Sequence, residues 1–218
     1  MEEVFILNST QSAANHYLAQ LRDINVQKDK LKFRYNLKRL GFLLGYELSK
    51  TLNYEYKKVQ TPLANMEIAY ANEDIVIISI LRAAIPFCDG FSEVFEDAPV
   101  GFIGAARQEY EKGMAPTIDL SYTALPDITQ KTVIFVDPML ATGQSIVAAV
   151  QQLKNLENAF SVHICSVVAA PEGVSFLKKN LPSGTQLWTC ALDECLNENY
   201  YIVPGLGDAG DLAYGSKI

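Results

Sequence analysis

Five runs of apolar, mostly β-branched residues alternate with amphipathic segments along most of this chain, and this alternation constrains the fold more than any other feature. A short continuous apolar run bounded by turn residues is typical of a strand buried on both faces. Strands that alternate with helices predict a mostly parallel sheet. The sequence therefore predicts an α/β fold with a twisted, mostly parallel sheet flanked by helices. The expected strands are 75–81, 100–104, 132–136, 162–168 and 186–192.

The first quarter of the chain has helical patterns. Four leucines at spacings of three and four residues predict one apolar face of a helix over 31–52. The first half of that helix is basic, which we interpret as a solvated face; a surface for an anionic effector or a partner subunit is the alternative. We expect one domain over 1–218, in which 1–58 form a helical extension. The leucines are Leu37, Leu40, Leu44 and Leu48.

Residues 107–130 interrupt the alternation with a polar, turn-rich stretch. A loop of this length in a compact domain is usually functional or mobile. Ile118, Leu120 and Tyr122 alternate within it, which predicts a β-hairpin arm. We expect this arm to be flexible in the empty site and to pack partly on a neighbouring subunit. A homodimer or higher homo-oligomer would then be the working unit.

Composition narrows the classes of function. The 218 residues include 18 Lys and Arg against 25 Asp and Glu, a net charge of −7, which predicts no nucleic-acid partner. The chain has no apolar stretch of membrane-spanning length and starts with acidic residues, so we expect a cytoplasmic protein without a membrane partner. Four cysteines without a C-x-x-C pair, together with two histidines, predict free thiols and no structural zinc.

The segment after the strand 132–136 is the most informative for function. It begins with Asp137 and continues through small residues to a helix expected to start near Ser145. A helix N-terminus in such a loop offers N–H groups and partial positive charge to a phosphate. Asp137 only accepts hydrogen bonds, so it suits ribose hydroxyls. An N-capped helix with Asp137 as a turn former is the alternative. The expected loop comprises Asp137, Pro138, Met139, Leu140, Ala141, Thr142, Gly143, Gln144 and Ser145.

Two arginines follow expected strands. Arg82 comes directly after 75–81, and its planar guanidinium suits bidentate bonds to a diphosphate. A surface ion pair is the alternative for Arg82. Arg107 opens the polar arm, from which it would add a second guanidinium. A solvated loop charge is the alternative for Arg107.

A glycine-rich segment lies near the end of the chain. Residues 204–211 hold three glycines and two acids, a composition that allows tight turns and close approach of the backbone to a flat ligand. Backbone N–H and C=O groups match the alternating acceptors and donors of a pyrimidine base. The alternative is a glycine-rich turn with solvated acids.

Together these segments resemble the motifs of the uracil phosphoribosyltransferases, within the type I phosphoribosyltransferases. VDPMLATGQS at 136–145 resembles the family's phosphoribosyl-diphosphate loop, and ILRAA at 80–84 resembles its diphosphate-contacting loop. AAPEG at 169–173 and YIVPGLGDAGD at 201–211 resemble its later motifs. The resemblance runs from about Val59 to the last residues.

The resemblance implies transfer of phosphoribose from 5-phospho-α-D-ribose 1-diphosphate to uracil, giving UMP and diphosphate in pyrimidine salvage. It implies Mg²⁺ bound with the sugar diphosphate, no metal site made by the protein alone, and GTP as a candidate effector. Arg82, Arg107 and Asp137 are implied in catalysis. These three residues, the loop 138–145 and Asp208 would bind the sugar diphosphate. The implied uracil contacts are Ile202, Gly207, Asp208 and Ala209.

The sequence departs from the usual family wording without losing a charged contact. Gln144, Ala84 and Tyr200 each stand where a glycine is usual. Two other functional classes are left open: a nucleotide-sensing regulator with the same fold, and an inactive homologue that binds uracil nucleotides. Transfer to a purine base is a third alternative, and the segment 204–211 weighs against it.

Overall fold

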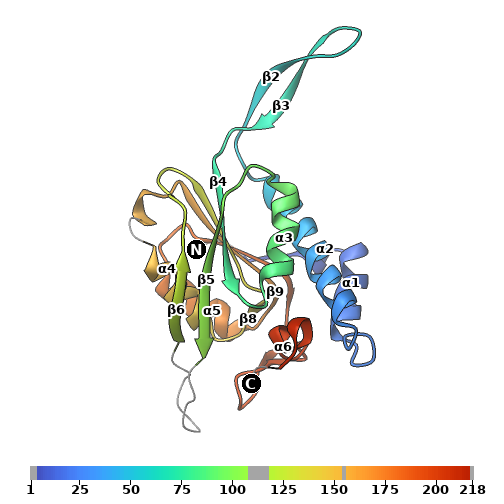
Figure 1. Cartoon of the computed structure of the whole chain (residues 1–218), viewed down its shortest axis with the longest axis vertical. Coiled ribbons are helices and arrows are strands. Elements are labelled where there is room, and N and C mark those ends of the chain that lie inside the picture. Colours follow the sequence, from blue (N-terminus) through green and yellow to red (C-terminus); the bar gives the residue numbers. More distant parts are fainter. Residues whose placement is uncertain (1–3, 108–117, 154–155, 217–218) are drawn as a thin grey trace.

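The computed structural model describes residues 4–107, 118–153 and 156–216, with side chains left out at 106–107 and 118–121. Its centre is a sheet in the order β1-β10-β9-β7-β4-β5-β6, with β8 paired to β9 (Figure 1). The pairs are parallel except for the antiparallel pair β5–β6. The strands are β1 (Phe5–Ile6), β4 (Ile75–Leu81), β5 (Val100–Arg107), β6 (Ile118–Ala124), β7 (Thr132–Val136), β8 (Met139–Leu140), β9 (Ser161–Ala169) and β10 (Gln186–Leu192).

Helices cover both faces of this sheet (Figure 1). One face carries α1 (Ala13–Arg22), α2 (Lys30–Ser49) and α3 (Ile85–Val94). The other carries α4 (Gln144–Gln152) and α5 (Pro171–Asn180), and the short α6 (Ala209–Tyr214) lies near the end of the chain. Short 3-10 helices occupy Leu7–Ser9 and Leu156–Asn158. The predicted fold class, a mostly parallel sheet flanked by helices, is confirmed.

None of the described helices combines the length and the apolarity that crossing a membrane requires.

The strands serve two hydrophobic cores, one on each face. Ile77 and Ile134 pack into the core beneath α2 and α3, whereas their neighbours Ile78 and Phe135 pack into the core beneath α4 and α5. All four side chains are completely buried. This explains why the strand sequences are continuously apolar, because successive residues point to opposite faces and both faces are covered.

The long helix predicted over 31–52 is present as α2, and its four predicted leucines are fully buried. The glycines in the interior of α2 have a packing role that the amino-acid pattern alone does not reveal. A Cβ on Gly41 would lie 2.1 Å from the carbonyl oxygen of Phe87, and one on Gly90 of α3 would lie 2.1 Å from that of Lys38. Both glycines are therefore required for the close contact between α2 and α3.

The prediction that 1–58 is a helical extension is wrong at its C-terminal end. The helix α2 ends at Ser49, and β2 (Tyr54–Gln60) pairs antiparallel with β3 (Asn65–Ala71). This hairpin projects from the end of the sheet opposite the carboxyl ends of the parallel strands (Figure 1). All of its strand residues except Val59 are exposed. It was missed because it has no buried face to impose an apolar pattern.

The hairpin predicted within 107–130 is confirmed for the described residues. Strand β5 runs three residues beyond the expected end at 104, and β6 pairs antiparallel with it, with Gly104 opposite Tyr122. Of the arm predicted to be flexible, 107–130, residues 108–117 lie outside the described residues, and the flexibility of the arm stays a prediction.

All four cysteines are free, as predicted. Three are buried, and burial raises the pKa of the Cys88 thiol to about 11. Cys195 is exposed.

A chain of side-chain hydrogen bonds crosses the sheet at its amino-terminal edge. Trp188 Nε1 donates to His163 Nδ1 at 3.1 Å, so the proton of the neutral imidazole belongs on Nε2, 3.1 Å from Ser161 Oγ. Ser161 Oγ lies 3.0 Å from Thr132 Oγ1, which donates to a carboxylate oxygen of Glu73. Burial lowers the pKa of His163 to about 4, although the nearby Glu73 acts in the opposite direction.

The burial of neutral His163 in this series of hydrogen bonds predicts that the protein loses stability in mild acid. The unfolded chain takes up the His163 proton near pH 6.5, whereas the folded protein resists it to about pH 4. The free energy of unfolding should therefore fall by on the order of 3 kcal/mol as the pH decreases through this window. Urea unfolding should show a shallower pH dependence in His163→Gln than in the wild type. The exposed-histidine variant His16→Gln is the control and should follow the wild type; equal slopes in all three proteins would contradict the prediction.

Candidate functional site

The parallel strands bring the predicted site residues to one edge of the sheet. Ser79 of β4 pairs with Val136, the last residue of β7, and β4 continues to Leu81, so the chain leaves both strands at the same end of the sheet. Arg82 follows the end of β4, and Asp137 follows the end of β7. The carboxyl ends of parallel strands, where neighbouring loops diverge, are where open α/β sheets bind ligands.

The loop after β7 is held on the sheet by its backbone. Asp137 N–H donates to the carbonyl oxygen of Cys165 at 3.1 Å, and Asp137 Oδ1 accepts from Met139 N–H at 3.1 Å. The carbonyl oxygen of Pro138 accepts from the N–H groups of Val167 and Val168, at 3.1 and 3.0 Å. The two-residue strand β8 then pairs with β9, an element that the sequence analysis did not predict. These hydrogen bonds hold the loop on the sheet without any contribution from a ligand.

The helix α4 begins one residue before the predicted start, at Gln144. Its N-cap residue is Gly143, with φ of 80°, a left-handed conformation that glycine adopts without strain. Gly143 has no side chain to cap the helix, and the N–H of Gln144 donates to Thr142 Oγ1 at 3.4 Å. The start of α4 borders the small hollow lined by this loop, so the positive end of the helix dipole lies at the hollow. The hollow is lined by Asp137, Met139, Leu140, Ala141, Thr142, Gly143, Ser145 and Ile146.

The start of α5 supports the same loop from behind. A Cβ on Gly173 would lie 2.2 Å from the carbonyl oxygen of Ala141, so only glycine permits this approach. Glu172, one residue earlier, accepts a hydrogen bond at 2.9 Å from the N–H of Leu196 in β11 (Cys195–Leu196). The segment 169–173 therefore connects the loop to the small hairpin of β11 and β12 (Ile202–Val203).

Arg82 lies between the end of β4 and α6. Its Nη2 lies 3.5 Å from Asp211 Oδ1 and 3.3 Å from the carbonyl oxygen of Gly215. Its Nε is buried and has no hydrogen-bond partner within the described part of the chain. Arg107 is the last residue of β5, and its side chain lies outside the described residues.

The segment 202–209 contains both buried and exposed residues. Ile202 and Ala209 are only 4% and 1% exposed as whole residues, so both belong to the core, whereas Gly207 and Asp208 are exposed. Gly207 has φ of 91°, and the exposed Asp208 caps α6 by accepting from Asp211 N–H at 3.0 Å. A ligand at this segment would therefore first meet the exposed Gly207 and Asp208, and Gly207 has only its backbone to offer.

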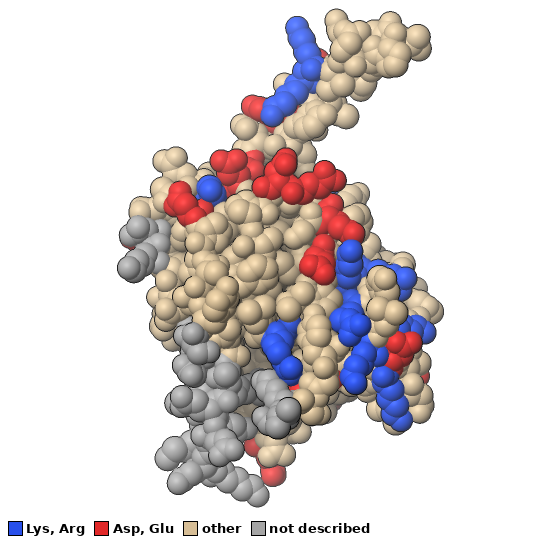
Figure 2. Space-filling view, viewed as in Figure 1, with Lys and Arg blue, Asp and Glu red and all other residues tan. Residues whose placement is uncertain are grey.

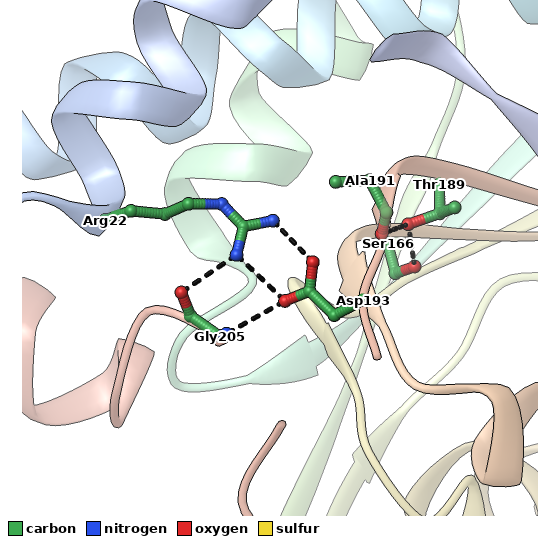
Figure 3. A network of polar contacts seen from close by, with 6 residues as sticks. All are labelled: Arg22, Ser166, Thr189, Ala191, Asp193 and Gly205. Carbon is green, nitrogen blue, oxygen red and sulfur yellow. Dashed lines mark hydrogen bonds and ion pairs between the residues drawn. The ribbon is translucent and has the colours of Figure 1, made fainter. Parts of the chain in front are cut away.

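A buried ion pair fixes the turn at Gly205, which the sequence analysis did not identify (Figure 3). Arg22 donates from Nη2 to Asp193 Oδ1 at 2.6 Å and from Nη1 to Oδ2 at 2.8 Å. Arg22 Nη1 also donates to the carbonyl oxygen of Gly205 at 3.0 Å, and Gly205 N–H donates to Asp193 Oδ2 at 2.9 Å. The Asp193 side chain is only 4% exposed. The end of α1 thus positions the backbone that leads into 206–209.

The three residues that stand where the family usually has a glycine lie in different local environments. Tyr200 has φ of 59°, a left-handed conformation that explains why a glycine is usual there. Ala84 is the N-cap of α3 with φ of −73°, so its methyl group causes no backbone strain. The Oε1 atom of Gln144 is buried without a hydrogen-bond partner among the described residues.

The structure therefore brings Arg82, Asp137 and the loop 138–145 to one edge, and the contact of Arg82 with Asp211 connects that edge to the segment 202–209. The predicted set omitted Asp211 as a contact of Arg82, although Asp211 stood within the glycine-rich segment. It also omitted Arg22 and Asp193, for which no local pattern gave a signal.

The Arg22 pair makes a prediction about stability. In Arg22→Ala the Asp193 carboxylate stays buried without its cation, which should reduce the free energy of unfolding by about 3 kcal/mol. The matched control is Lys50→Ala, which breaks an exposed pair of similar length, 2.7 Å to Glu47, and should cost less than about 1 kcal/mol. Urea denaturation of both variants measures the difference. Similar losses in the two variants would show that the Arg22 pair has no special role.

Nearly the whole chain is similar to known proteins. The family model described as uracil phosphoribosyltransferase matches residues 8–216. A uracil phosphoribosyltransferase from Porphyromonas gingivalis is 39% identical over 216 residues, which cover 99% of this chain and 100% of that protein. One from Pyrococcus furiosus is 41% identical over 204 residues, which cover 92% of this chain and 85% of that protein.

A solved structure has the same fold over the same length. The AQ2163 protein from Aquifex aeolicus superposes with a TM-score of 0.86 at 33% sequence identity, covering 99% of this chain and 100% of that one. The chain belongs to the uracil phosphoribosyltransferase family.

Proposed function

We propose that this chain transfers the phosphoribosyl group of 5-phospho-α-D-ribose 1-diphosphate to uracil at the carboxyl edge of its sheet, as one domain over 1–218. A bond forms between uracil N1 and the anomeric carbon, the bond from that carbon to the diphosphate oxygen breaks, and N1 loses its proton. UMP and diphosphate are the products. The observation that carries the proposal is the fixed loop 137–145 at the end of β7, beside Arg82 at the end of β4.

The loop would hold the ribose 5-phosphate end of the substrate. The α4 N-terminus offers backbone N–H groups and a favourable dipole to a phosphate, and the hydroxyls of Thr142 and Ser145 add donors. Asp137, the first residue of this loop, would accept hydrogen bonds from the ribose hydroxyls. Because strand pairing fixes the loop, the anomeric carbon would be held in one place, which is the main requirement for a displacement at that carbon.

Arg82 and Arg107 would neutralise the departing diphosphate. The Nε of Arg82 has no hydrogen-bond partner among the described residues, which supports this role, because a guanidinium with an unused donor has capacity for an oxyanion. Uracil would lie against 202–209, where Ile202, Gly207 and Ala209 offer backbone groups to the edge of the base. Asp208 stands between the two substrates in this arrangement.

Mg²⁺ would enter with the sugar diphosphate. The described residues contain no cluster of three or more His, Cys, Asp or Glu side chains able to hold a metal, whereas Asp137 and Asp208 bring carboxylate oxygens to the site edge. These residues fit Mg²⁺, which is usually bound by one or two carboxylates together with substrate phosphates. When bound, Mg²⁺ would offset the charge that develops on the leaving diphosphate.

A homo-oligomer is the proposed working unit, and the hairpin β2–β3 now supports it better than the arm at 107–130. A two-stranded hairpin without a sheet behind it is marginally stable alone. One of its faces carries Val59, Met66, Ile68 and Tyr70 beside the ion pair of Glu55 and Lys57, and Met66, Ile68 and Tyr70 are more than 40% exposed. We propose that another copy of the chain covers this face.

A GTP effector would suit the outer face of α2. Figure 2 shows basic side chains gathered over α1 and α2, and acidic ones at the base of the hairpin. A groove of about 380 Å³ on this basic side combines aromatic rings with Lys38 and Arg39, which suit the base and phosphates of a nucleotide. The aromatic residues that line the groove are Tyr17, Tyr35 and Phe42.

The cytoplasm is the proposed location, because the four free thiols suit a reducing compartment.

A base panel tests the proposed reaction. The enzyme with sugar diphosphate and Mg²⁺ is given uracil, cytosine, hypoxanthine, adenine or orotate, and diphosphate release is measured. Release of diphosphate with uracil, and with none of the other four bases, supports the proposal. Release with hypoxanthine or adenine would indicate a purine enzyme, and no release with any base would indicate an inactive homologue or a regulator.

Replacement of Asp137 should damage turnover without damaging the fold. Asp137→Asn keeps the size and the bond to Met139 N–H but removes the charge that holds the ribose hydroxyls. We expect kcat/KM to fall by about 100-fold with an unchanged unfolding midpoint. Near-normal kcat/KM in the folded variant would exclude the ribose role.

A negative charge among the exposed apolar side chains of this hairpin face should dissociate the oligomer. Ile68→Glu alters the face that carries Val59, Met66 and Tyr70, whereas Lys58→Glu on the opposite face is the control. Light scattering coupled to size exclusion should give a multiple of the chain mass for the wild type and the control, and a lower mass for Ile68→Glu. A monomeric wild type would contradict the proposal.

A further inference from the structure

Two arginine–aspartate pairs near the site differ sharply in strength. Arg22 and Asp193 form a bidentate pair at 2.6 and 2.8 Å, with the Asp193 side chain 4% exposed. Arg82 and Asp211 approach only to 3.5 Å, and their side chains are 40% and 41% exposed. A long, exposed pair contributes little to stability, so the second pair is easily exchanged for another partner.

The guanidinium of Arg82 is also incompletely bonded. Its second contact, with the carbonyl oxygen of Gly215, is long at 3.3 Å. Its Nε is buried without a partner in the described chain, a costly arrangement for a charged donor. A diphosphate offers several charged oxygens, which make shorter and stronger bonds with a guanidinium than one distant carboxylate does.

We propose that Asp211 is an internal stand-in for the diphosphate: its carboxylate holds Arg82 while the site is empty and releases it when the sugar diphosphate binds. This inference rests on the proposed function, since Arg82 must be a diphosphate contact. Asp211 is then a positioning residue that acts through Arg82. Its carboxylate competes with the substrate for the same guanidinium.

The exchange reaches the proposed uracil segment through α6. Asp211 N–H donates to Asp208 Oδ1 at 3.0 Å, so the carboxylate that holds Arg82 and the N-cap of α6 belong to the same helical turn. Gly210 lies between them, and a Cβ there would be 3.2 Å from Asp208 Oδ1 and 3.9 Å from Arg82 Nη2. Release of Arg82 would therefore loosen α6, which begins at Ala209 directly after its N-cap residue Asp208.

Binding of inorganic diphosphate with Mg²⁺ tests the exchange by calorimetry. Removal of the competing carboxylate in Asp211→Asn should tighten diphosphate binding by about two- to fivefold. The matched control is Glu194→Gln, which removes one exposed negative charge from the loop after β10 and should leave the affinity within about 1.5-fold. In an Arg82→Gln background, Asp211→Asn should no longer tighten binding.

Hydrogen exchange over residues 209–216 gives a second readout that does not require measurable binding by Arg82→Gln. Diphosphate should increase exchange there in the wild type, and Asp211→Asn should show the increased exchange without ligand. Unchanged affinity in Asp211→Asn, or equal tightening in the Arg82→Gln background, would overturn the proposal, as would increased protection of 209–216. No binding of diphosphate to the wild type would overturn the proposed site as well, which distinguishes the two failures.

Discussion

Parallel pairing of the central strands is the constraint on which the rest of the structure depends. It sends the carboxyl ends of β4, β7, β9 and β10 to one edge, so residues from distant parts of the sequence meet there. It also requires a crossover after each strand, and these crossovers are the helices that cover both faces (Figure 1). The continuously apolar strands and the single ligand edge therefore have the same cause.

Contacts from outside the sheet complete this edge, and they differ in strength in a way that suits their roles. Arg22 reaches from the end of α1 to Asp193 and Gly205 through short, largely buried bonds, which fix the turn before 206–209 (Figure 3). Arg82 reaches α6 only through long, half-exposed contacts. Acidic side chains, meanwhile, line a hollow at the opposite end of the sheet, at Glu73, Asp74, Glu96 and Asp97. The edge proposed for the anionic substrate is thus kept apart from this acidic end.

The parts of the structure that could be predicted from sequence are those with a local pattern. The strands 75–81 and 132–136 were predicted to the residue because burial on both faces makes them continuously apolar. The hairpin β2–β3 was missed because it contacts no core of its own chain. The Arg22–Asp193 pair joins residues 171 positions apart, so no window of sequence contains it. The roles of Arg82 and the loop 137–145 followed from family motifs, whereas the contact of Arg82 with Asp211 required coordinates.

A crystal structure of the chain with UMP would test the central claim most directly, because UMP carries both the phosphate and the base of the proposed product. The account predicts the phosphate on the backbone N–H groups at the start of α4, the ribose hydroxyls at Asp137, and the edge of the uracil ring on the backbone of 202–209. UMP bound elsewhere, such as in the groove over α2, with the loop 137–145 making no contact to it, would contradict the account.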